Sequence, residues 1–261
     1  MTMTDSLFDL SGLNALVTGS SRGIGRAIAD RFVQHGARVV ISSRKADACE
    51  ATAAEINARR GRADAAVPIA ANVSRREDLV GLYARSVAAL GKVDLLVCNA
   101  AIHPYVGPAM GTSDEAMRKV IDANIIGNHW LIQQALPGML ERGFGRIVLI
   151  ASIAGHFGSD KFYSYSMTKA ADMQMARALA VEHGRNGIRV NTVAPGTILT
   201  DMARNMTENE EFMANEMRRN TIQRLGAPDE IAGVVVMLCS PAGAYVNGQV
   251  INVDGGYTIS F

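Results

Sequence analysis

The segment from Thr18 to Gly25 reads TGSSRGIG and lies between the apolar run LNALVT (13–18) and the helix-like stretch GIGRAIADRFVQHG (23–36). Its glycines at 19, 23 and 25 allow a tight turn and let backbone N–H groups approach a pyrophosphate at the start of the helix. A plain structural turn can have the same composition. The position of this turn between the first strand and the first helix favours dinucleotide binding.

Further along the chain, short apolar runs alternate with longer helix-like stretches. The strand-like runs are ARVVIS (37–42), DAAVPIA (64–70), KVDLLVC (92–98), RIVLIAS (146–152), IRVNTVA (188–194) and QVINVDGG (249–256). This alternation is typical of parallel strands joined by right-handed crossovers. The sequence therefore predicts an α/β protein with a doubly wound Rossmann fold, about seven parallel strands with helices on both faces. No linker divides the chain, so we expect one domain spanning residues 1–261.

The composition excludes several classes of partner. The 261 residues include 26 Lys+Arg and 25 Asp+Glu, and a net charge of +1 gives no general attraction to nucleic acid or to an anionic membrane. No apolar run approaches the ~20 residues that span a bilayer, and the start of the chain has no secretory signal pattern. Cys49, Cys98 and Cys239 stand far apart, without metal-ligand spacing. We expect a soluble, cytoplasmic protein with no metal, nucleic-acid or membrane partner.

A second informative stretch, YSYSMTK (163–169), contains two tyrosines followed by a lysine. Tyrosine alone has a pKa near ~10 and is a poor acid or base at neutral pH. Residues four apart share a face of a helix, so Tyr165 and Lys169 are neighbours, whereas Tyr163 lies roughly 120° away around the axis. The positive charge of Lys169 favours the tyrosinate. Tyr165 is therefore the candidate for passing a proton to a carbonyl oxygen or taking one from an alcohol.

Taken together, these motifs resemble those of the short-chain dehydrogenase/reductase family. The glycine turn has the spacing T-G-x-x-x-G-x-G, and the resemblance covers essentially the whole chain. The other matching motifs are CNAA (98–101), DANIIG (122–127), the Tyr-x-x-x-Lys motif (165–169), NTVAPG (191–196) and NVDGG (252–256). The resemblance implies an enzyme that moves a hydride between a nicotinamide cofactor and a small molecule.

The resemblance also implies four catalytic residues: Asn124, Ser152, Tyr165 and Lys169. Lys169 would bind the nicotinamide ribose hydroxyls as well as acting on Tyr165. Ser152 would hydrogen-bond the substrate oxygen, and Asn124 would hold a water beside Lys169 for proton relay. Each of these residues alone has an ordinary structural explanation, but all four occur in the family order after a dinucleotide turn.

The end of the second strand bears on the choice of cofactor. Dinucleotide folds that prefer NAD usually have an acidic residue there, which would repel the 2′-phosphate of NADP. The stretch Ile41–Lys45 has no acid, and the next one is Asp47. Arg44 can hold a 2′-phosphate with its planar fork of donors, Ser43 adds a hydroxyl, and Arg22 adds a positive charge. We expect NADP(H) to be preferred, with NAD(H) possible; a solvated basic loop is the alternative interpretation.

The expected cofactor contacts come from the glycine turn and from the ends of later strands. They are Gly19, Ser21, Arg22, Gly23, Ile24, Gly25, Ser43, Arg44, Asn72, Val73, Asn99, Ala100, Tyr165, Lys169, Pro195, Gly196 and Ile198. Two positions depart from the family pattern. Ala101 stands where glycine is usual, which affects how closely the backbone approaches the cofactor ribose. Asn72 stands where aspartate is frequent, and its amide oxygen can still accept a hydrogen bond from the adenine amine.

The substrate is less well defined. The stretch TGSSRGIGRAIA (18–29) resembles bacterial 3-oxoacyl carrier-protein reductases, whereas SSRK (42–45) and NAAIHPYVG (99–107) are more similar to NADP-dependent carbonyl reductases. We expect a ketone, an aldehyde or a secondary alcohol as the small-molecule substrate. The alternatives are a 3-oxoacyl carrier-protein reductase, an NAD-dependent alcohol dehydrogenase, a non-catalytic nucleotide-responsive binding protein and a methyltransferase that uses S-adenosylmethionine.

Three further expectations concern the surroundings of the site. The polar, Met-rich segment 197–220 is either a surface helix pair or a substrate lid, whose apolar residues would be Met202, Met206, Phe212, Met213 and Met217. His103 and His156 follow strands, a position that can bring them near the pocket, but they lack metal-ligand spacing, so ordinary loop positions are the default expectation. By the family resemblance, the long Met/Ala-rich helix 167–184 would pack against other copies of the chain in a homotetramer.

Overall fold

The computed structural model describes residues 7–201, 203 and 208–260. A single sheet of seven parallel strands runs in the order β3-β2-β1-β4-β5-β6-β7. The strands are β1 (Asn14–Thr18), β2 (Arg38–Ser42), β3 (Ala66–Pro68), β4 (Leu95–Cys98), β5 (Gly145–Ile150), β6 (Ile188–Pro195) and β7 (Val250–Val253). The predicted doubly wound sheet is confirmed.

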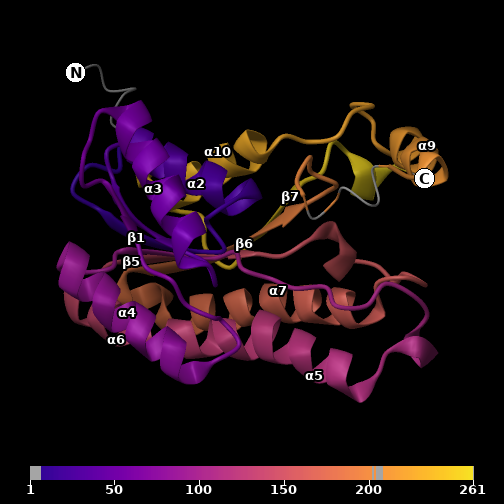
Figure 1. Cartoon of the computed structure of the whole chain (residues 1–261), viewed down its shortest axis with the longest axis horizontal. Helices are drawn as coiled ribbons and strands as arrows, with labels where there is room; N and C mark the ends of the chain where they lie inside the picture. Colours follow the sequence, from indigo (N-terminus) through magenta and orange to yellow (C-terminus); the bar gives the residue numbers. More distant parts are fainter. Residues whose placement is uncertain (1–6, 202, 204–207, 261) are drawn as a thin grey trace.

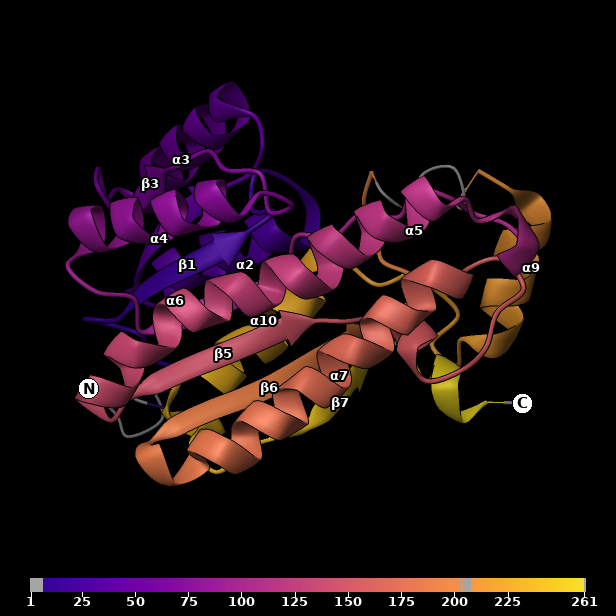
Figure 2. The same ribbon diagram turned by 90° about the horizontal axis from the view of Figure 1, so that it is seen from below.

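Helices cover both faces of this sheet (Figure 1). On one face lie α2 (Gly23–Gln34), α3 (Ala46–Arg60) and α10 (Pro228–Cys239). The other face is covered by α4 (Arg76–Leu90), α6 (Gly127–Arg142) and α7 (Tyr163–His183). Two more helices, α5 (Asp114–Ile121) and α9 (Glu210–Arg219), lie at the same end of the sheet, beyond the carboxyl ends of its strands (Figure 2). Within the described ranges, no helix combines the length and the apolar character needed to span a membrane.

The two helical layers enclose two apolar cores, and successive strand residues point into them alternately. In β1, Ala15 and Val17 pack toward α2, α3 and α10, whereas Leu16 packs toward α4 and α6. In β2, Val39 likewise packs in the first of these cores and Val40 in the second. Strands buried on both sides need apolar residues at every position, which explains why the sequence shows continuous apolar runs rather than alternation.

The strand order reverses between β1 and β4, because the chain leaves β1 toward one face and β4 toward the other. At such a switch point the loops diverge and leave a crevice outside the carboxyl ends of the strands. The glycine turn follows β1 and the CNAA motif follows β4, so both border this crevice. The fold thus places the two sequence motifs at the position where open α/β sheets bind their ligands.

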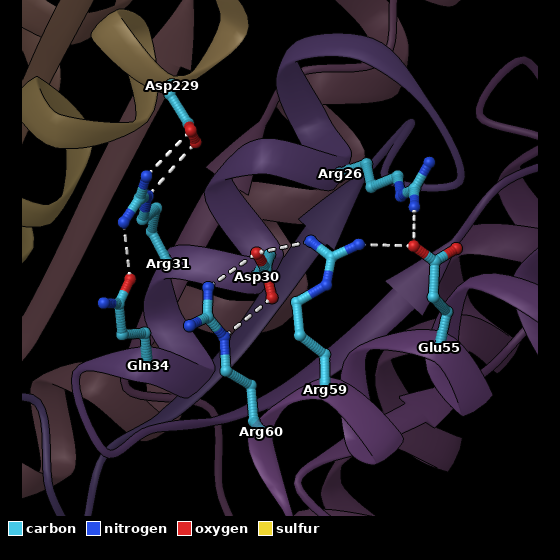
Figure 3. Close-up of polar contacts among 8 residues, drawn as sticks. All are labelled: Arg26, Asp30, Arg31, Gln34, Glu55, Arg59, Arg60 and Asp229. Atoms are coloured by element: carbon cyan, nitrogen blue, oxygen red, sulfur yellow. Dashed lines mark hydrogen bonds and ion pairs between the residues drawn. The ribbon is translucent and has the colours of Figure 1, made fainter.

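A network of ion pairs fixes α2, whose N-terminus follows the glycine turn, against its neighbouring helices (Figure 3). The buried Asp30 of α2 accepts hydrogen bonds from Arg59 (3.2 Å) and Arg60 (2.7 and 3.0 Å) of α3. Arg31 of α2 makes a bidentate pair with Asp229 of α10, at 2.7 and 3.1 Å. The network also includes Arg26, Gln34 and Glu55. These contacts hold α2 from both sides.

The segment 197–220 is described in part. Ile198 pairs with Gly226 beside the end of the sheet, and α9 contains Phe212, Met213 and Met217 of the expected apolar lid. Two other expected members, Met202 and Met206, lie outside the described residues. The fully buried member of α9 is the polar Glu216.

The C-terminal part of the chain holds α9 in place. The guanidinium of Arg219 lies 4.2 Å from the ring centre of Tyr257 and donates a hydrogen bond of 3.2 Å to its hydroxyl. Such cation–π contacts favour a fixed arrangement of the two side chains. The end of α9 is therefore attached to the segment that follows β7.

Candidate active site

The glycines of this turn allow close packing that larger residues would prevent. Gly19 and Gly23 have φ angles of +66° and +56°, a region that disfavours residues with a Cβ. A Cβ on Gly19 would lie 2.9 Å from the Cα of Ala100, and a Cβ on Gly25 would overlap the carbonyl oxygen of Gly19. The turn, which includes Ser21 and Ile24, leads directly into the N-terminus of α2, whose first backbone N–H groups have no acceptor within the helix. This arrangement fits a pyrophosphate.

Asn99 and Ala100 connect this turn to β4. The amide of Asn99 donates to the carbonyl oxygens of Thr18 (2.9 Å) and Gly19 (3.1 Å). The hydroxyl of Thr18 accepts from the backbone N–H groups of Asn99 and Ala100, both at 3.1 Å. The side chain of Asn99 thus holds the shape of the glycine turn, and it is the backbone here that borders the crevice.

Arg44 follows β2 with an exposed side chain. Among the described residues it makes no hydrogen bond and no ion pair. The hydroxyl of neighbouring Ser43 lies 3.2 Å from the Sγ of Cys49, which also accepts the Ser43 N–H at 3.1 Å. Arg22 lies in the glycine turn, and its guanidinium is 3.7 Å from the carboxylate of Asp201. Arg22 and Arg44, the two cations expected near a 2′-phosphate, are both exposed, and Arg44 is available to contact it.

Asn72 and Val73 follow β3. The side-chain oxygen of Asn72 accepts the N–H of Ser74 at 3.1 Å, and the backbone N–H of Asn72 donates to the carboxylate of Asp78 at 3.0 Å. An amide oxygen can accept two hydrogen bonds, so one position stays open for an adenine amine. A Cβ on Gly127 would overlap the carbonyl oxygen of Val73, so α6 begins in close contact with this loop.

Pro195, Gly196 and Ile198 follow β6. The N–H of Gly196 donates to the carbonyl oxygen of Val253 at 3.0 Å, and a Cβ on Gly196 would lie 2.9 Å from the Cα of Asp254. Pro195 is the last residue of β6, and the side chain of Ile198 is buried. The turn is therefore packed tightly against the end of β7, and only glycine fits at position 196.

Tyr165 and Lys169 lie one turn apart in α7, as predicted. Lys169 is only 2% exposed, and its Nζ donates to the carbonyl oxygen of Ile150 (2.7 Å) and to the carboxylate of Asp172 (3.1 Å). The same nitrogen lies 5.6 Å from the ring centre of Tyr165. Among the described residues the hydroxyl of Tyr165 makes no hydrogen bond. The helix thus presents an unpaired phenol next to a buried ammonium group.

The charge of Lys169 depends on its surroundings. Burial on its own lowers the pKa of Lys169, but the carboxylate of Asp172 and the phenol of Tyr165 act in the opposite direction, and the net pKa lies above the ordinary lysine value. Lys169 is therefore protonated at neutral pH. A positive charge is thereby fixed beside the ring of Tyr165.

Ser152 and Asn124 come to the same place from other elements. Ser152 follows β5 and caps the short 3₁₀ turn Ile153–Gly155, its Oγ accepting the N–H of Ala154 at 3.2 Å. This turn packs on α7, since a Cβ on Gly155 would lie 2.9 Å from the carbonyl carbon of Lys169. Asn124 lies in the π-helical segment Asp122–Ile126 between α5 and α6.

The side chain of Asn124 connects two parts of the site. Its Oδ1 accepts the N–H of Ile102 at 2.9 Å, and its Nδ2 donates to the carbonyl oxygen of Ile102 (3.0 Å) and to the hydroxyl of Thr168 (3.1 Å). The loop after β4 is thereby fixed to the turn of α7 that carries Lys169. The four residues expected to be catalytic thus surround the carboxyl ends of β4 and β5.

His103 is a site residue that the sequence did not distinguish from a loop histidine. Its ring centre lies 4.8 Å from that of Tyr165 and 5.3 Å from that of Phe162. Burial lowers the pKa of His103, and its buried Nε2 has no hydrogen-bond partner in the described part of the chain. A neutral imidazole therefore lies beside the catalytic candidate. His156, by contrast, is engaged with Asn252 at 2.8 Å.

A cleft of about 530 Å³ opens between the loop after β4 and the loop before α7. Its lining residues are Val106, Gly107, Pro108, Ala109, Ser159, Asp160, Lys161 and Tyr163. The N–H of Gly107 donates to the carbonyl oxygen of Lys161 at 2.9 Å and joins the two loops. Tyr163 is half-exposed and forms part of the wall, on a different side of α7 from Lys169.

Comparison with known proteins places this geometry in a family. Residues 19–258 match the family model described as enoyl-(acyl carrier protein) reductase. The human dehydrogenase/reductase SDR family member 2, mitochondrial, is 38% identical over 92% of this chain and 85% of its own length. Human dehydrogenase/reductase SDR family member 4 is 37% identical over 93% of this chain and 86% of its own.

Solved structures of dehydrogenases have the same fold as this chain. A 7α-hydroxysteroid dehydrogenase in complex with NADH and 7-oxo glycochenodeoxycholic acid superposes with a TM-score of 0.91, at 34% identity and 98% coverage of both chains. A gluconate 5-dehydrogenase from Burkholderia cenocepacia, in complex with NADP and tartrate, has a TM-score of 0.91 at 30% identity, covering 99% of this chain and 100% of its own.

The fold and the site define a nicotinamide-dependent oxidoreductase that transfers a hydride to or from a small molecule. This chain belongs to the short-chain dehydrogenase/reductase family.

Proposed function

We propose that the protein uses NADP(H) to interconvert a ketone or aldehyde and a secondary or primary alcohol, with Tyr165 as the acid–base residue. The observation that carries this proposal is the unpaired hydroxyl of Tyr165 beside the buried, charged Lys169. A phenol in that setting can donate a proton to a carbonyl oxygen and recover it from an alcohol.

The other residues act on this proton transfer or on binding. The dinucleotide, when bound, supplies or accepts the hydride at its nicotinamide ring. Lys169 stabilises the tyrosinate and binds the ribose hydroxyls through its ammonium group. Ser152 orients the substrate oxygen toward Tyr165, and Asn124 fixes the loop after β4 and holds a water near Lys169. His103 supplies a neutral ring against which the substrate and Tyr165 pack.

The preference for NADP(H) is supported by the end of β2. Arg44 is exposed and unengaged within the described residues, and no acidic side chain lies between Ser42 and Lys45. A guanidinium can form paired hydrogen bonds with a phosphate, whereas an acid at this position would select the ribose hydroxyls of NAD. The solved relatives include both an NADH and an NADP complex, so the preference rests on the residues of this chain.

A 3-oxoacyl thioester is the second candidate substrate. It is favoured by the sequence of the glycine turn, TGSSRGIGRAIA (18–29), and by the family model, whose description names an acyl carrier protein. A simple ketone or aldehyde is favoured by the stretches SSRK (42–45) and NAAIHPYVG (99–107), which are similar to NADP-dependent carbonyl reductases.

We also propose that segment 197–220 closes over the bound substrate. The start of this segment lies against the glycine turn, since a Cβ on Gly23 would lie 3.4 Å from the Thr200 side chain and Arg22 pairs with Asp201. Its other end, α9, lies beyond the carboxyl ends of the strands (Figure 2). The described start of the segment therefore lies at the glycine turn, and its described end lies beyond the sheet, as a segment that closes over the site would require.

Two proposals concern the protein as a whole. The exposed apolar side chains of Met167 and Val181 on α7 support packing of this helix in a homotetramer; a monomer mass by light scattering at micromolar concentration would contradict that assembly. The unpaired cysteines Cys49, Cys98 and Cys239 support a reducing compartment, the cytoplasm. Recovery of the protein outside the cytosolic fraction of its own cells would contradict this location.

One experiment tests the function. The purified protein is assayed with NADPH and NADH against a panel of ketones, aldehydes and acetoacetyl thioester, by absorbance of the reduced cofactor, alongside thermal shifts with NADPH, NADH and S-adenosylmethionine. We expect a thermal shift with NADPH and turnover of carbonyl compounds. A shift with S-adenosylmethionine alone, or nucleotide binding without turnover of any carbonyl compound, would overturn the proposal.

A further inference from the structure

A buried carboxylate, Asp172, pairs with the proposed catalytic lysine, Lys169. Asp172 lies three residues after Lys169 in α7, is fully buried, and its Oδ2 lies 3.1 Å from the Lys169 Nζ. Its Oδ1 accepts a hydrogen bond of 2.9 Å from the amide of Asn128 in α6, which is also buried. The same amide nitrogen donates to the carbonyl oxygen of Asn124 at 2.8 Å. Polar groups thus connect Lys169 to the backbone of Asn124.

The groups that face Lys169 come from three elements. Tyr165 and Asp172 face it from α7, Cys98 from β4, and the carbonyl oxygen of Ile150 from β5. Burial raises the pKa of the Cys98 thiol well above its usual range, so this group stays neutral. In the described part of the chain, the Asp172 carboxylate is therefore the negative charge that faces the lysine at neutral pH.

A buried ion pair is expensive, because both charges lose their hydration. An apolar residue at position 172 would avoid this cost, and Lys169 would still have the Ile150 carbonyl as an acceptor. An ammonium group without a counter-charge in such a site would tend to lose its proton. The observed arrangement instead keeps the charge and fixes its position with hydrogen bonds to both oxygens of the carboxylate.

We propose that Asp172, itself oriented by the hydrogen bond from Asn128, is a positioning residue that keeps Lys169 charged and fixed one turn from Tyr165. This inference rests on the proposed function, which gives Lys169 its role toward Tyr165 and the cofactor. Asp172 and Asn128 act through Lys169 and do not touch the reacting atoms.

The expected change in the pKa of Lys169 follows from the opposing contributions to the pKa values of Lys169 and Asp172. At Lys169, burial lowers the pKa, and Asp172 raises it. At Asp172, burial raises the pKa above its ordinary value, and Lys169 and the hydrogen bond from Asn128 partly offset this. Loss of the Asp172 charge removes the largest contribution that opposes burial, so the pKa of Lys169 falls. Because lysine loses its charge as pH rises, the variant becomes uncharged at a lower pH than the wild type.

The test follows Lys169 directly. The chain has five lysines, at positions 45, 92, 119, 161 and 169, so carbon-13 labelling at lysine Cε gives few resonances, and a Lys169→Arg variant assigns the one in question. In the full chain without cofactor, we expect wild-type Lys169 to titrate above the ordinary value of about 10.4. Asp172→Asn, which preserves shape, should lower the midpoint by about 1 to 3 units. An unchanged midpoint would overturn the inference.

A matched control separates this effect from the general loss of a buried carboxylate. Asp94 is also buried, lies 3.2 Å from Lys92 and 3.6 Å from Arg142, and precedes β4 at the opposite end of the sheet. Asp94→Asn should leave the Lys169 midpoint in place. A shift there as large as that in Asp172→Asn would contradict a specific role. If Asp172→Asn does not fold, Asn128→Val replaces it as the test. This variant should lower the titration midpoint of Lys169 by a smaller amount, and an unchanged midpoint would overturn the inference.

Activity gives a second readout. In Asp172→Asn, carbonyl reduction with NADPH should decline with rising pH about 1 to 3 units earlier than in the wild type, since it requires charged Lys169. A lower rate with a wild-type pH profile would show a structural role only and contradict the inference. The titration of Lys169 needs neither cofactor nor substrate. A wild-type protein that binds no nicotinamide cofactor would therefore overturn the proposed function and leave that titration as the test of Asp172.

Discussion

Lys169 in α7 donates a hydrogen bond from its Nζ to the carbonyl oxygen of Ile150, 2.7 Å away, at the last residue of β5. This bond joins the helix that carries Tyr165 to the strand that precedes Ser152. A buried ammonium group must find acceptors, and a hydrogen bond from a charged donor is stronger than one between neutral groups. The lysine therefore sets the position of the helix relative to the strand as well as the charge of the site.

Lys169→Met tests the two proposed roles of this lysine, in binding the cofactor and in supporting proton transfer by Tyr165. Methionine has a similar length and no charge, so it retains packing and loses the donors. Loss of a charged hydrogen bond, worth ~1.5–3 kcal/mol, should weaken NADPH binding by about 10- to 100-fold. Turnover should fall as well, because the tyrosinate loses its neighbouring charge. Isothermal titration with NADPH and steady-state kinetics measure the two effects, and an unchanged NADPH affinity would contradict the ribose contact.

Arg44→Asp tests the cofactor preference. The wild type should have a higher kcat/KM with NADPH than with NADH, because Arg44 meets the 2′-phosphate. The variant should invert or erase this preference, since a charge-assisted hydrogen bond of ~1.5–3 kcal/mol is replaced by repulsion.

The control for this change is Arg185→Asp, which alters charge equally at an exposed position at the opposite end of the sheet. It should leave the ratio of the two kcat/KM values unchanged. A wild type that uses NADH as well as or better than NADPH would show that Arg44 is only a surface residue.

Glu230→Gln tests a pH-dependent contribution to stability. Two hydrogen bonds from Arg224, at 2.6 and 2.8 Å, and one from the Ala227 N–H lower the pKa of Glu230 from 4.5 to about 2. A lowered pKa in the folded state means that the stabilisation is complete above the unfolded value and disappears as pH falls through the folded one. The variant should therefore have a lower Tm than the wild type above pH ~5, with a difference that shrinks as pH falls from ~4.5 toward ~2. A difference independent of pH would contradict this account.

Asp30→Asn tests the network that holds α2. Asp30 is buried and pairs with both Arg59 and Arg60, so its loss should lower the free energy of unfolding by about 1 to 3 kcal/mol. Chemical denaturation measures this change. Glu115→Gln, which removes an exposed pair with Lys119 on α5, is the control and should have little effect. Equal effects in the two variants would contradict a special role for the network.

The fold and the main site residues could be predicted because each is encoded locally. Strands buried on both faces must be apolar throughout, and this produced the runs that the sequence shows. The glycine turn and the CNAA motif follow strands directly, so their meeting at the carboxyl ends of β1 and β4 follows from a parallel sheet. Tyr165 and Lys169 share a helix, so their distance depends only on helix geometry.

The features that could not be predicted depend on packing between elements. Asn128 reaches Asp172 only because α6 and α7 lie side by side over the sheet (Figure 2). Neither residue belongs to a motif, and 44 positions separate them. His103 meets the ring of Tyr165 because the loop after β4 folds back over α7, and its sequence neighbours do not indicate this contact. The contacts of Asn124 with Ile102 and Thr168 likewise join residues from three different elements.

The choice between two tyrosines is the centre of the account. Tyr165 lies beside Lys169 with an unpaired hydroxyl, and Tyr163 lies on the wall of the cleft. Tyr165→Phe removes the hydroxyl and keeps the ring, and Tyr163→Phe makes the same change on another side of α7. Circular dichroism and NADPH titration establish that both variants fold and bind cofactor.

The decisive measurement is kcat for carbonyl reduction with NADPH in these two variants. Tyr165→Phe should lower kcat by at least ~10²-fold, the low end for general acid–base catalysis, with NADPH affinity largely retained. Tyr163→Phe should have a far smaller effect. A Tyr165→Phe enzyme that turns over near the wild-type rate, or a Tyr163→Phe enzyme that is the inactive one, would contradict the account.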